Sequence, residues 1–173
     1  IESYDISHTF GADNVAGMVV FHNGRPMKSA YKRFAIKGFD GQNDVGSMQE
    51  VLTRRFNHYY NDEDGSTFKI LPDLILLDGG VGHVSTVKQA AKECGVDIPI
   101  FGMVKDDFHK TRTITDGKHE ISIAKDALLF NFIYKIQEEV HRFTFSKMDA
   151  ARRKRMKKTE LTNVKGVGEA KAK

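Results

Sequence analysis

The stretch Leu74-Ile75-Leu76-Leu77-Asp78-Gly79-Gly80 decides the fold of this 173-residue chain. Its four apolar residues leave no polar side, which is typical of a strand that is covered on both faces. The run ends abruptly at Asp78, and a short helical pattern follows, with Val84, Val87, Ala91 and Cys94 turned inward and Gly95 as its end. A buried strand followed at once by a helix indicates an α/β domain.

Three further strands precede this stretch. Ile1 to Ser7 alternates weakly, Val15 to Phe21 is apolar, and Ser29 to Ile36 alternates again. Asn23-Gly24, the favoured pair for a tight hairpin turn, lies between the second and the third. The three strands therefore predict an antiparallel meander.

A helix is expected next, from about Asp44 to Tyr59, because its apolar residues recur at helical spacing. Ser47 and Glu50 have the form of a capping box. Arg54 and Arg55 are expected to point away from the apolar stripe.

The sequence after the central stretch adds a strand, a hairpin and a long helix. Ile98 to Val104 is a second buried strand, Thr111 to Ile123 has the form of a small hairpin, and a helix is expected from about Asp126 to Phe145. This helix has two apolar stripes, which predicts packing on more than one side. Together the elements predict a single α/β domain over residues 1–150, with a mixed five-stranded sheet flanked by helices.

The net charge of +4 is unevenly distributed. Residues 147–173 carry ten Lys and Arg against three Asp and Glu, whereas residues 1–146 carry 17 against 20. A basic terminal segment indicates a polyanionic partner, most commonly nucleic acid, and a solvated charge run without a partner is the alternative. No apolar stretch reaches the roughly 20 residues of a membrane helix, no signal segment opens the chain, and the single Cys94 cannot form an internal disulfide. A reducing, cytoplasmic setting away from membranes is therefore expected.

Asp5 and Asp78 are the first candidates for chemistry. A right-handed crossover would place the strand that ends at Asp78 parallel to the first strand, and neighbouring strands lie about 4.8 Å apart. The two carboxylates would then lie side by side near the carboxyl ends of the strands, where open sheets bind ligands. At about 4 Å such a pair repels by about 4 kcal/mol at an effective dielectric of 20. A divalent cation such as Mg²⁺ or Mn²⁺ removes this penalty, whereas a turn-forming role for Asp78 is the structural alternative.

His141 is the third candidate and lies on the second apolar stripe of the last helix. It shares that stripe with Tyr134, and Glu138 and Glu139 lie close by. A neutral imidazole could bind a metal, or could accept a proton from an attacking water. On pattern alone, however, a histidine on a half-buried helical face is more often a hydrogen-bonded packing residue.

Basic residues are expected near the same edge of the sheet. Lys105 directly follows a buried strand, so it should project at the edge that carries Asp78, and Lys110 and Arg112 follow it in the chain. These cations could hold a phosphate or stabilise the charge of a pentacovalent transition state. A solvated loop is the alternative.

Five segments occur in order and carry a resemblance to a known family. They are Tyr4-Asp5-Ile6-Ser7-His8, Val51-Leu52-Thr53-Arg54-Arg55, Pro72-Asp73-Leu74-Ile75-Leu76-Leu77-Asp78-Gly79-Gly80, His109-Lys110-Thr111-Arg112 and Glu138-Glu139-Val140-His141-Arg142-Phe143. Over nearly the whole chain they closely resemble the C-terminal endonuclease domain of UvrC, the incision subunit of bacterial nucleotide excision repair. The resemblance implies a ribonuclease H-like fold and cutting of damaged double-stranded DNA on the 5′ side of the lesion. It also implies a catalytic and metal-binding triad of Asp5, Asp78 and His141.

The same resemblance implies features outside this triad. Gly166-Val167-Gly168 looks like the first hairpin of a helix-hairpin-helix DNA-binding module, so residues 151–173 would be a basic linker and the truncated start of that module. A longer protein is expected, whose other parts bind UvrB and make the second incision. Arg142 joins the three cations above as a DNA-binding candidate. Val81 and His83 depart from the Gly-Gly-Lys-Gly-Gln that the family often has after the second aspartate, so no phosphate contact is assigned to these side chains.

The sequence thus predicts a divalent-metal-dependent DNA endonuclease domain of nucleotide excision repair. A histidine in place of a third acid favours one tightly held metal ion, and His141 is either a ligand or the base. One alternative is a ribonuclease H-like enzyme that cuts an RNA·DNA hybrid or branched DNA, and another is a non-catalytic DNA-binding module. A nucleotide-binding enzyme that uses Gly79 to Gly82 as a phosphate loop ranks last, because the Gly-Lys-Ser/Thr ending is missing.

Overall fold

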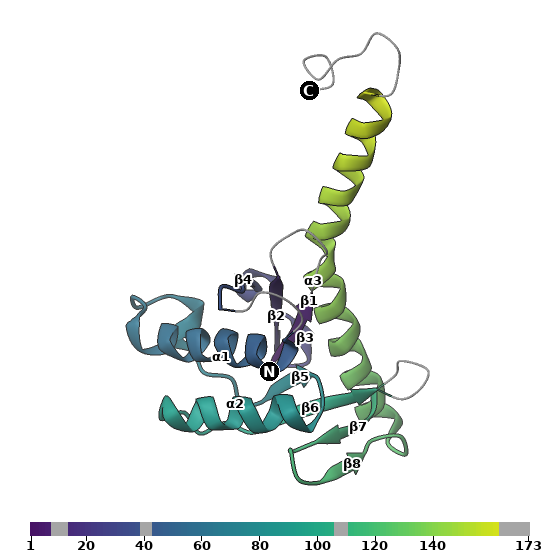
Figure 1. Ribbon diagram of the computed structural model, residues 1–173. Helices are drawn as coiled ribbons and strands as arrows, with labels where there is room; N and C mark the ends of the chain where they lie inside the picture. The colour runs from purple at the N-terminus through teal and green to yellow at the C-terminus, as the bar shows by residue number, and fades with distance from the viewer. Residues whose placement is uncertain (8–13, 39–42, 106–110, 163–173) are drawn as a thin grey trace.

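The computed structural model describes residues 1–7, 14–38, 43–105 and 111–162, with side chains as far as Ser146 (Figure 1). The strands are β1 (Glu2–Ser7), β2 (Val15–His22), β3 (Arg25–Pro26), β4 (Lys32–Ala35), β5 (Ile75–Asp78), β6 (Ile100–Lys105), β7 (Thr111–Thr115) and β8 (Glu120–Ser122). The helices are α1 (Asp44–Asn61), α2 (Val81–Glu93) and α3 (Ala127–Thr162), and two 3-10 turns are η1 (Lys28–Ala30) and η2 (Thr67–Lys69).

All eight strands of the described residues belong to one mixed sheet, in the order β3-β2-β1-β5-β6-β7-β8, with β4 also paired to β2. β1, β5 and β6 are parallel neighbours at its centre, and antiparallel strands flank them on both sides. The α/β class and the parallel pairing of the first strand with the strand that ends at Asp78 are confirmed. The predicted number of five strands is too low. The predicted hairpin continues the sheet as β7 and β8, and the two residues of β3 extend the opposite edge.

Helices cover both faces of this sheet (Figure 1): α1 and α2 pack on one face, and α3 packs on the other. Ile75 and Leu77 enter the core beneath α1 and α2, whereas Leu76 enters the core beneath α3. The central stretch has no polar side because each of its residues enters one of two cores. By the same alternation Asp78 lies on the face that α3 covers.

The N-terminus of α1 is capped differently from the prediction. The side chain of Asn43 accepts a hydrogen bond of 2.9 Å from the backbone N–H of Gly46. The carboxylate of Glu50 accepts hydrogen bonds from the backbone N–H groups of Lys37 and Gly38, in the segment after β4. The predicted capping box is therefore wrong, because Glu50 accepts hydrogen bonds from a distant segment of the backbone and not from the N-terminal backbone of α1.

Arg55 is buried, with none of its side chain exposed, so the prediction that it points away from the apolar stripe is wrong. Its Nη2 lies 2.7 Å from Oε1 of Glu2 on β1, and it also donates to the carbonyls of Phe68 and Ile70. The hydroxyl of Tyr4 donates to the same carboxylate. The burial of this arginine is tolerable because an opposite charge and backbone acceptors satisfy its donors.

The last helix is longer than predicted. α3 runs from Ala127 to Thr162, and its C-terminal part stands away from the sheet (Figure 1). Residues 151–162 of the predicted basic linker therefore belong to the helix. Among the described residues, no helix combines the length and the apolar character that crossing a bilayer requires.

Candidate active site

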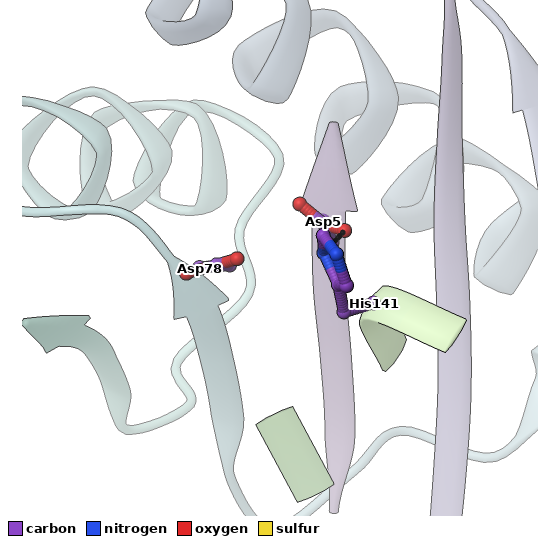
Figure 2. A group of neighbouring side chains, drawn as sticks. All are labelled: Asp5, Asp78 and His141. Atoms are coloured by element: carbon purple, nitrogen blue, oxygen red, sulfur yellow. Dashed lines mark ion pairs between the residues drawn. The ribbon is translucent and has the colours of Figure 1, made fainter. Parts of the chain in front are cut away.

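Three elements bring Asp5, Asp78 and His141 together, as Figure 2 shows. The register of the parallel pair sets Tyr4 beside Leu77, so the next residues, Asp5 and Asp78, are neighbours at the carboxyl ends of β1 and β5. His141 reaches them from α3. One ligand atom from each residue lies within 4.8 Å of the others, and Nδ1 of His141 is 3.4 Å from Oδ2 of Asp5. The expected adjacency of the two carboxylates is thus present.

A glycine lets α3 approach the sheet beside Asp5. Gly17 of β2 is the register partner of Asp5, and a Cβ atom at Gly17 would lie 2.2 Å from Oγ1 of Thr144. Thr144 is buried and donates to the carbonyl of Val140. Because Thr144 is three residues after His141, this close approach brings the turn of α3 that carries the histidine directly over β1 and β2.

Polar contacts hold α3 to the sheet on both sides of His141. On one side, Nη2 of Arg33 in β4 donates to the carbonyl of Phe143 at 2.5 Å and to Oγ of Ser146 at 2.7 Å. The guanidinium also lies 3.7 Å from the centre of the Phe143 ring. On the other side, the buried hydroxyl of Thr111 in β7 donates to Oε1 of Gln137 at 2.6 Å. These contacts fix the register of α3 against the sheet.

The electrostatics of the acidic pair favour a cation. The Asp5 side chain is 7% exposed, and its Oδ2 is buried without a hydrogen-bond partner. The pKa of Asp5 is raised from 3.8 to about 7, first by burial and then by the neighbouring Asp78 carboxylate, and Lys105 opposes this change in part. The two carboxylates are ligands that suit Mg²⁺ and Mn²⁺, and an imidazole nitrogen is a ligand for first-row transition metals. A buried carboxylate oxygen that accepts no hydrogen bond, together with the raised pKa, fits a bound divalent cation.

The three side chains line a pocket of about 260 Å³. Lys105 lines it too, with its Nζ 2.7 Å from Oδ2 of Asp78. Ile6 and Phe145 provide apolar sides, and the ring centroids of Phe145 and His141 lie 4.4 Å apart.

Two lining residues were not predicted as site residues, and one of them, His83, had been assigned no phosphate contact. Asp44 is the first residue of α1, and His83 lies in the first turn of α2. The ring of His83 packs against Gly79, where a Cβ atom would come within 2.5 Å of it. Both residues open helices on the face of the sheet opposite α3. The sequence signal for Asp44 was its place at a helix N-terminus, and that for His83 was its place in the segment after Asp78, where the chain departs from the family's usual residues.

Two of the other predicted DNA-binding residues, Arg112 and Arg142, lie apart from this pocket. Arg112 is exposed on β7 and does not line it. Arg142 is 58% exposed, is paired with Glu139 at 2.7 Å, and faces a different hollow that Lys28 also lines. Lys110 lies outside the described residues. Of the four predicted cations, the structure brings Lys105 to the acidic pair.

The class of this domain is ribonuclease H-like. Its mixed sheet has parallel central strands, helices on both faces and paired carboxylates at the carboxyl ends of the strands. Within that class, the family model of the UvrC RNase H endonuclease domain matches residues 1–145. The chain belongs to this family, which confirms the resemblance found in the sequence.

Full-length relatives agree with the family model. The chain is 45% identical to UvrABC system protein C of Thermoanaerobacter pseudethanolicus, over 100% of this chain and 30% of that protein. It is 43% identical to the protein of the same name from Acetivibrio thermocellus, over 97% of this chain and 29% of the relative. It is 44% identical to the protein of that name from Caldicellulosiruptor saccharolyticus, over 98% of this chain and 28% of the relative. The chain thus spans less than a third of the length of these relatives.

Proposed function

We propose that this chain is the part of a bacterial nucleotide excision repair protein that makes the 5′ incision beside a lesion, as a divalent-metal-dependent endonuclease. The observation that carries the proposal is the cluster of Asp5, Asp78 and His141, whose ligand atoms lie within 4.8 Å of one another. Membership of the UvrC endonuclease family supports the reaction class. The name of the relatives, UvrABC system protein C, supports the repair pathway.

Asp5, Asp78 and His141 would hold one Mg²⁺ or Mn²⁺. When bound, such an ion supplies a Lewis acid that activates water and neutralises charge on a phosphate. The two carboxylates provide the hard oxygen ligands, and their mutual repulsion makes a cation between them favourable. We assign His141 to the ligand set because its nearest nitrogen is 3.4 Å from Asp5.

Lys105 would orient the scissile phosphate in this pocket. Its ammonium is already at the acidic pair, bonded to Asp78. A cation at this place attracts a phosphate oxygen and stabilises negative charge that grows on it during hydrolysis. Lys110, Arg112 and Arg142 would contribute phosphate contacts farther along the DNA, which set the orientation of the duplex.

The proposed substrate is damaged double-stranded DNA, and the proposed partner is UvrB, bound through other parts of the full-length protein. We also propose a cytoplasmic location, where DNA is the substrate and Cys94 stays reduced. The basic segment of residues 147–173 supports a polyanionic partner.

The test is incision of a lesion-bearing duplex by the full-length protein, with and without Mg²⁺ or Mn²⁺. We expect wild-type protein to cut on the 5′ side when metal is present, and Asp5→Asn to lower the rate by at least roughly a thousandfold. Asp97→Asn, which alters an exposed aspartate outside the pocket, is the matched control and should cut normally. Cleavage by Asp5→Asn at the wild-type rate would refute the proposal. Faster cutting of an RNA·DNA hybrid than of the lesion-bearing duplex would show that the hybrid is the preferred substrate.

A further inference from the structure

The pocket contains a second histidine, His83, to which the proposed function gives no role. It lies in the first turn of α2, and its ring is pressed against Gly79, the residue that follows Asp78. A ring in this position forms part of the pocket wall on the side of α2, whereas His141 enters from α3. The approach is close, because a Cβ atom at residue 79 would lie 2.5 Å from Nδ1 of the ring.

His83 does not belong to the cation-binding cluster. Among the described residues, the ligand atoms that lie within 4.8 Å of one another come from Asp5, Asp78 and His141, and His83 is outside this group. The structure therefore places one imidazole with the acidic pair and a second imidazole in the same pocket, outside the cluster whose ligand atoms lie within 4.8 Å of one another. The two histidines consequently need different roles.

The ring of His83 has unused hydrogen-bonding capacity. Neither of its nitrogens has a hydrogen-bond partner among the described residues. Burial lowers the pKa of His83, and the carboxylates of Asp44 and Asp78 oppose this effect only in part. A neutral imidazole offers one N–H donor and one acceptor. Lys105, in contrast, already donates to Asp78.

We propose that His83 donates a hydrogen bond to a non-bridging oxygen of the DNA phosphodiester that occupies this pocket. The inference rests on the proposed function, since it assumes that DNA enters the pocket beside the acidic pair. A phosphodiester held at Asp5 and Asp78 needs donors on its remaining sides. The partially buried N–H of His83 meets that need without adding a charge to the site. His83 is thus a DNA-contacting residue that helps to position the phosphate.

Binding of a short DNA duplex to the Asp78→Asn chain, in EDTA, tests this without any cleavage. The Asn removes one negative charge, so the phosphate can enter without a cation. In this background we expect His83→Phe, which keeps the ring against Gly79, to weaken binding by roughly tenfold or more. His83→Gln keeps a neutral donor and should stay within a factor of about three of the parent. His22→Phe, at an exposed histidine outside the pocket, is the control and should change nothing.

The salt dependence separates a neutral hydrogen bond from a charge. Each cation that neutralises a phosphate contributes about 0.9 to the slope of log affinity against log salt. His83→Phe should therefore weaken binding with the slope unchanged, whereas Lys105→Met in the same background should lower the slope by about 0.9. The inference would be overturned if His83→Phe bound DNA as tightly as its parent. It would also be overturned if His83→Phe lowered the slope of log affinity against log salt.

Calorimetric titration of Mn²⁺ into chains with Asp78 intact provides the second readout. His83→Phe should bind Mn²⁺ as tightly as wild type, and a clear loss of Mn²⁺ affinity would overturn the inference by placing His83 with the cation. Failure of the proposed function is distinguishable. A wild-type full-length protein that never cuts DNA would refute the endonuclease proposal alone, because the binding experiment on His83 requires no incision.

Discussion

Asp5 is the residue whose protonation should govern how the stability of the metal-free protein depends on pH. Burial, with Asp78 as its neighbour, raises its pKa from 3.8 to about 7. A carboxyl group whose pKa is higher in the folded protein binds its proton more tightly when folded. Stability is therefore greatest at low pH and is lost as the pH rises from about 4 to about 7. We expect this loss to lower the urea midpoint of the protein in EDTA as the pH rises from about 4 to about 7.

The matched control is Asp5→Asn, which keeps the shape and removes the ionisation. Its urea midpoint should change less over the same pH range. Adding Mn²⁺ to the wild type should restore stability at the higher pH, because the cation then binds an ionised pair. If wild type and Asp5→Asn lose stability in parallel, another group governs the pH dependence.

The roles of single residues were predictable where they followed from strand order, and unpredictable where they depended on distant partners. Asp5 and Asp78 could be placed side by side because two parallel strands end at the same edge of the sheet. Arg55 could not be placed, because its partner Glu2 lies 53 residues away on β1. His83 was given no role for a related reason. It was noted as a departure from the family's usual residues, but the pocket that it lines is assembled from β1, β5, β6 and three helices, and the sequence does not show that these elements meet.

At the scale of elements, the approach of α3 to β2 should control the cation site. A Cβ atom at Gly17 would lie 3.1 Å from the Cα of Thr144 as well as 2.2 Å from its Oγ1. Because one of these atoms is backbone, rotation of the Thr144 side chain cannot relieve the contact, and α3 must shift together with His141. We expect Gly17→Ala to cost about 1–3 kcal/mol of stability and to weaken Mn²⁺ binding roughly tenfold.

Two further variants make this prediction specific. Thr144→Ala added to Gly17→Ala removes the closest contact and should recover part of the Mn²⁺ affinity. Gly82→Ala is the control, since its Cβ would meet only Val45, at an ordinary 3.7 Å. Calorimetry would measure the Mn²⁺ affinity and urea titration the stability. If Gly17→Ala binds Mn²⁺ as tightly as the wild type does, the close approach of α3 to β2 does not position His141.

The elements themselves were predicted well where local pattern decides them. Both buried strands and all three helices lie where the apolar spacing placed them, because that spacing reflects which face enters a core. The ends and edges were predicted less well. The capping box failed because Glu50 accepts hydrogen bonds from Lys37 and Gly38. The strand count failed because a hairpin sequence does not reveal whether its strands join a larger sheet.

At the scale of the whole molecule, the excess positive charge lies in a different part of the chain from the sheet and the acidic pocket. Residues 1–146, which contain the sheet and the acidic pocket, carry 17 Lys and Arg against 20 Asp and Glu, and residues 147–173 carry ten against three. The backbone of α3 continues through the first part of this basic segment and stands away from the sheet (Figure 1). A negatively charged body repels DNA at long range, so the basic segment should provide most of the attraction.

This division predicts where the salt dependence of DNA binding originates. We expect replacement of Arg152, Arg153, Lys154 and Arg155 by Gln to weaken DNA binding strongly and to lower the salt slope by up to about four, if each residue neutralises one phosphate. The matched control replaces four exposed lysines of the body, Lys92, Lys118, Lys125 and Lys135. Because both variants lose four positive charges, net charge alone would affect them equally, and fluorescence anisotropy over a series of salt concentrations would compare them. Equal losses in the two variants would rule out the basic segment as the main DNA contact, whereas a larger loss in the first would show that the acidic domain is brought to DNA by its C-terminal extension.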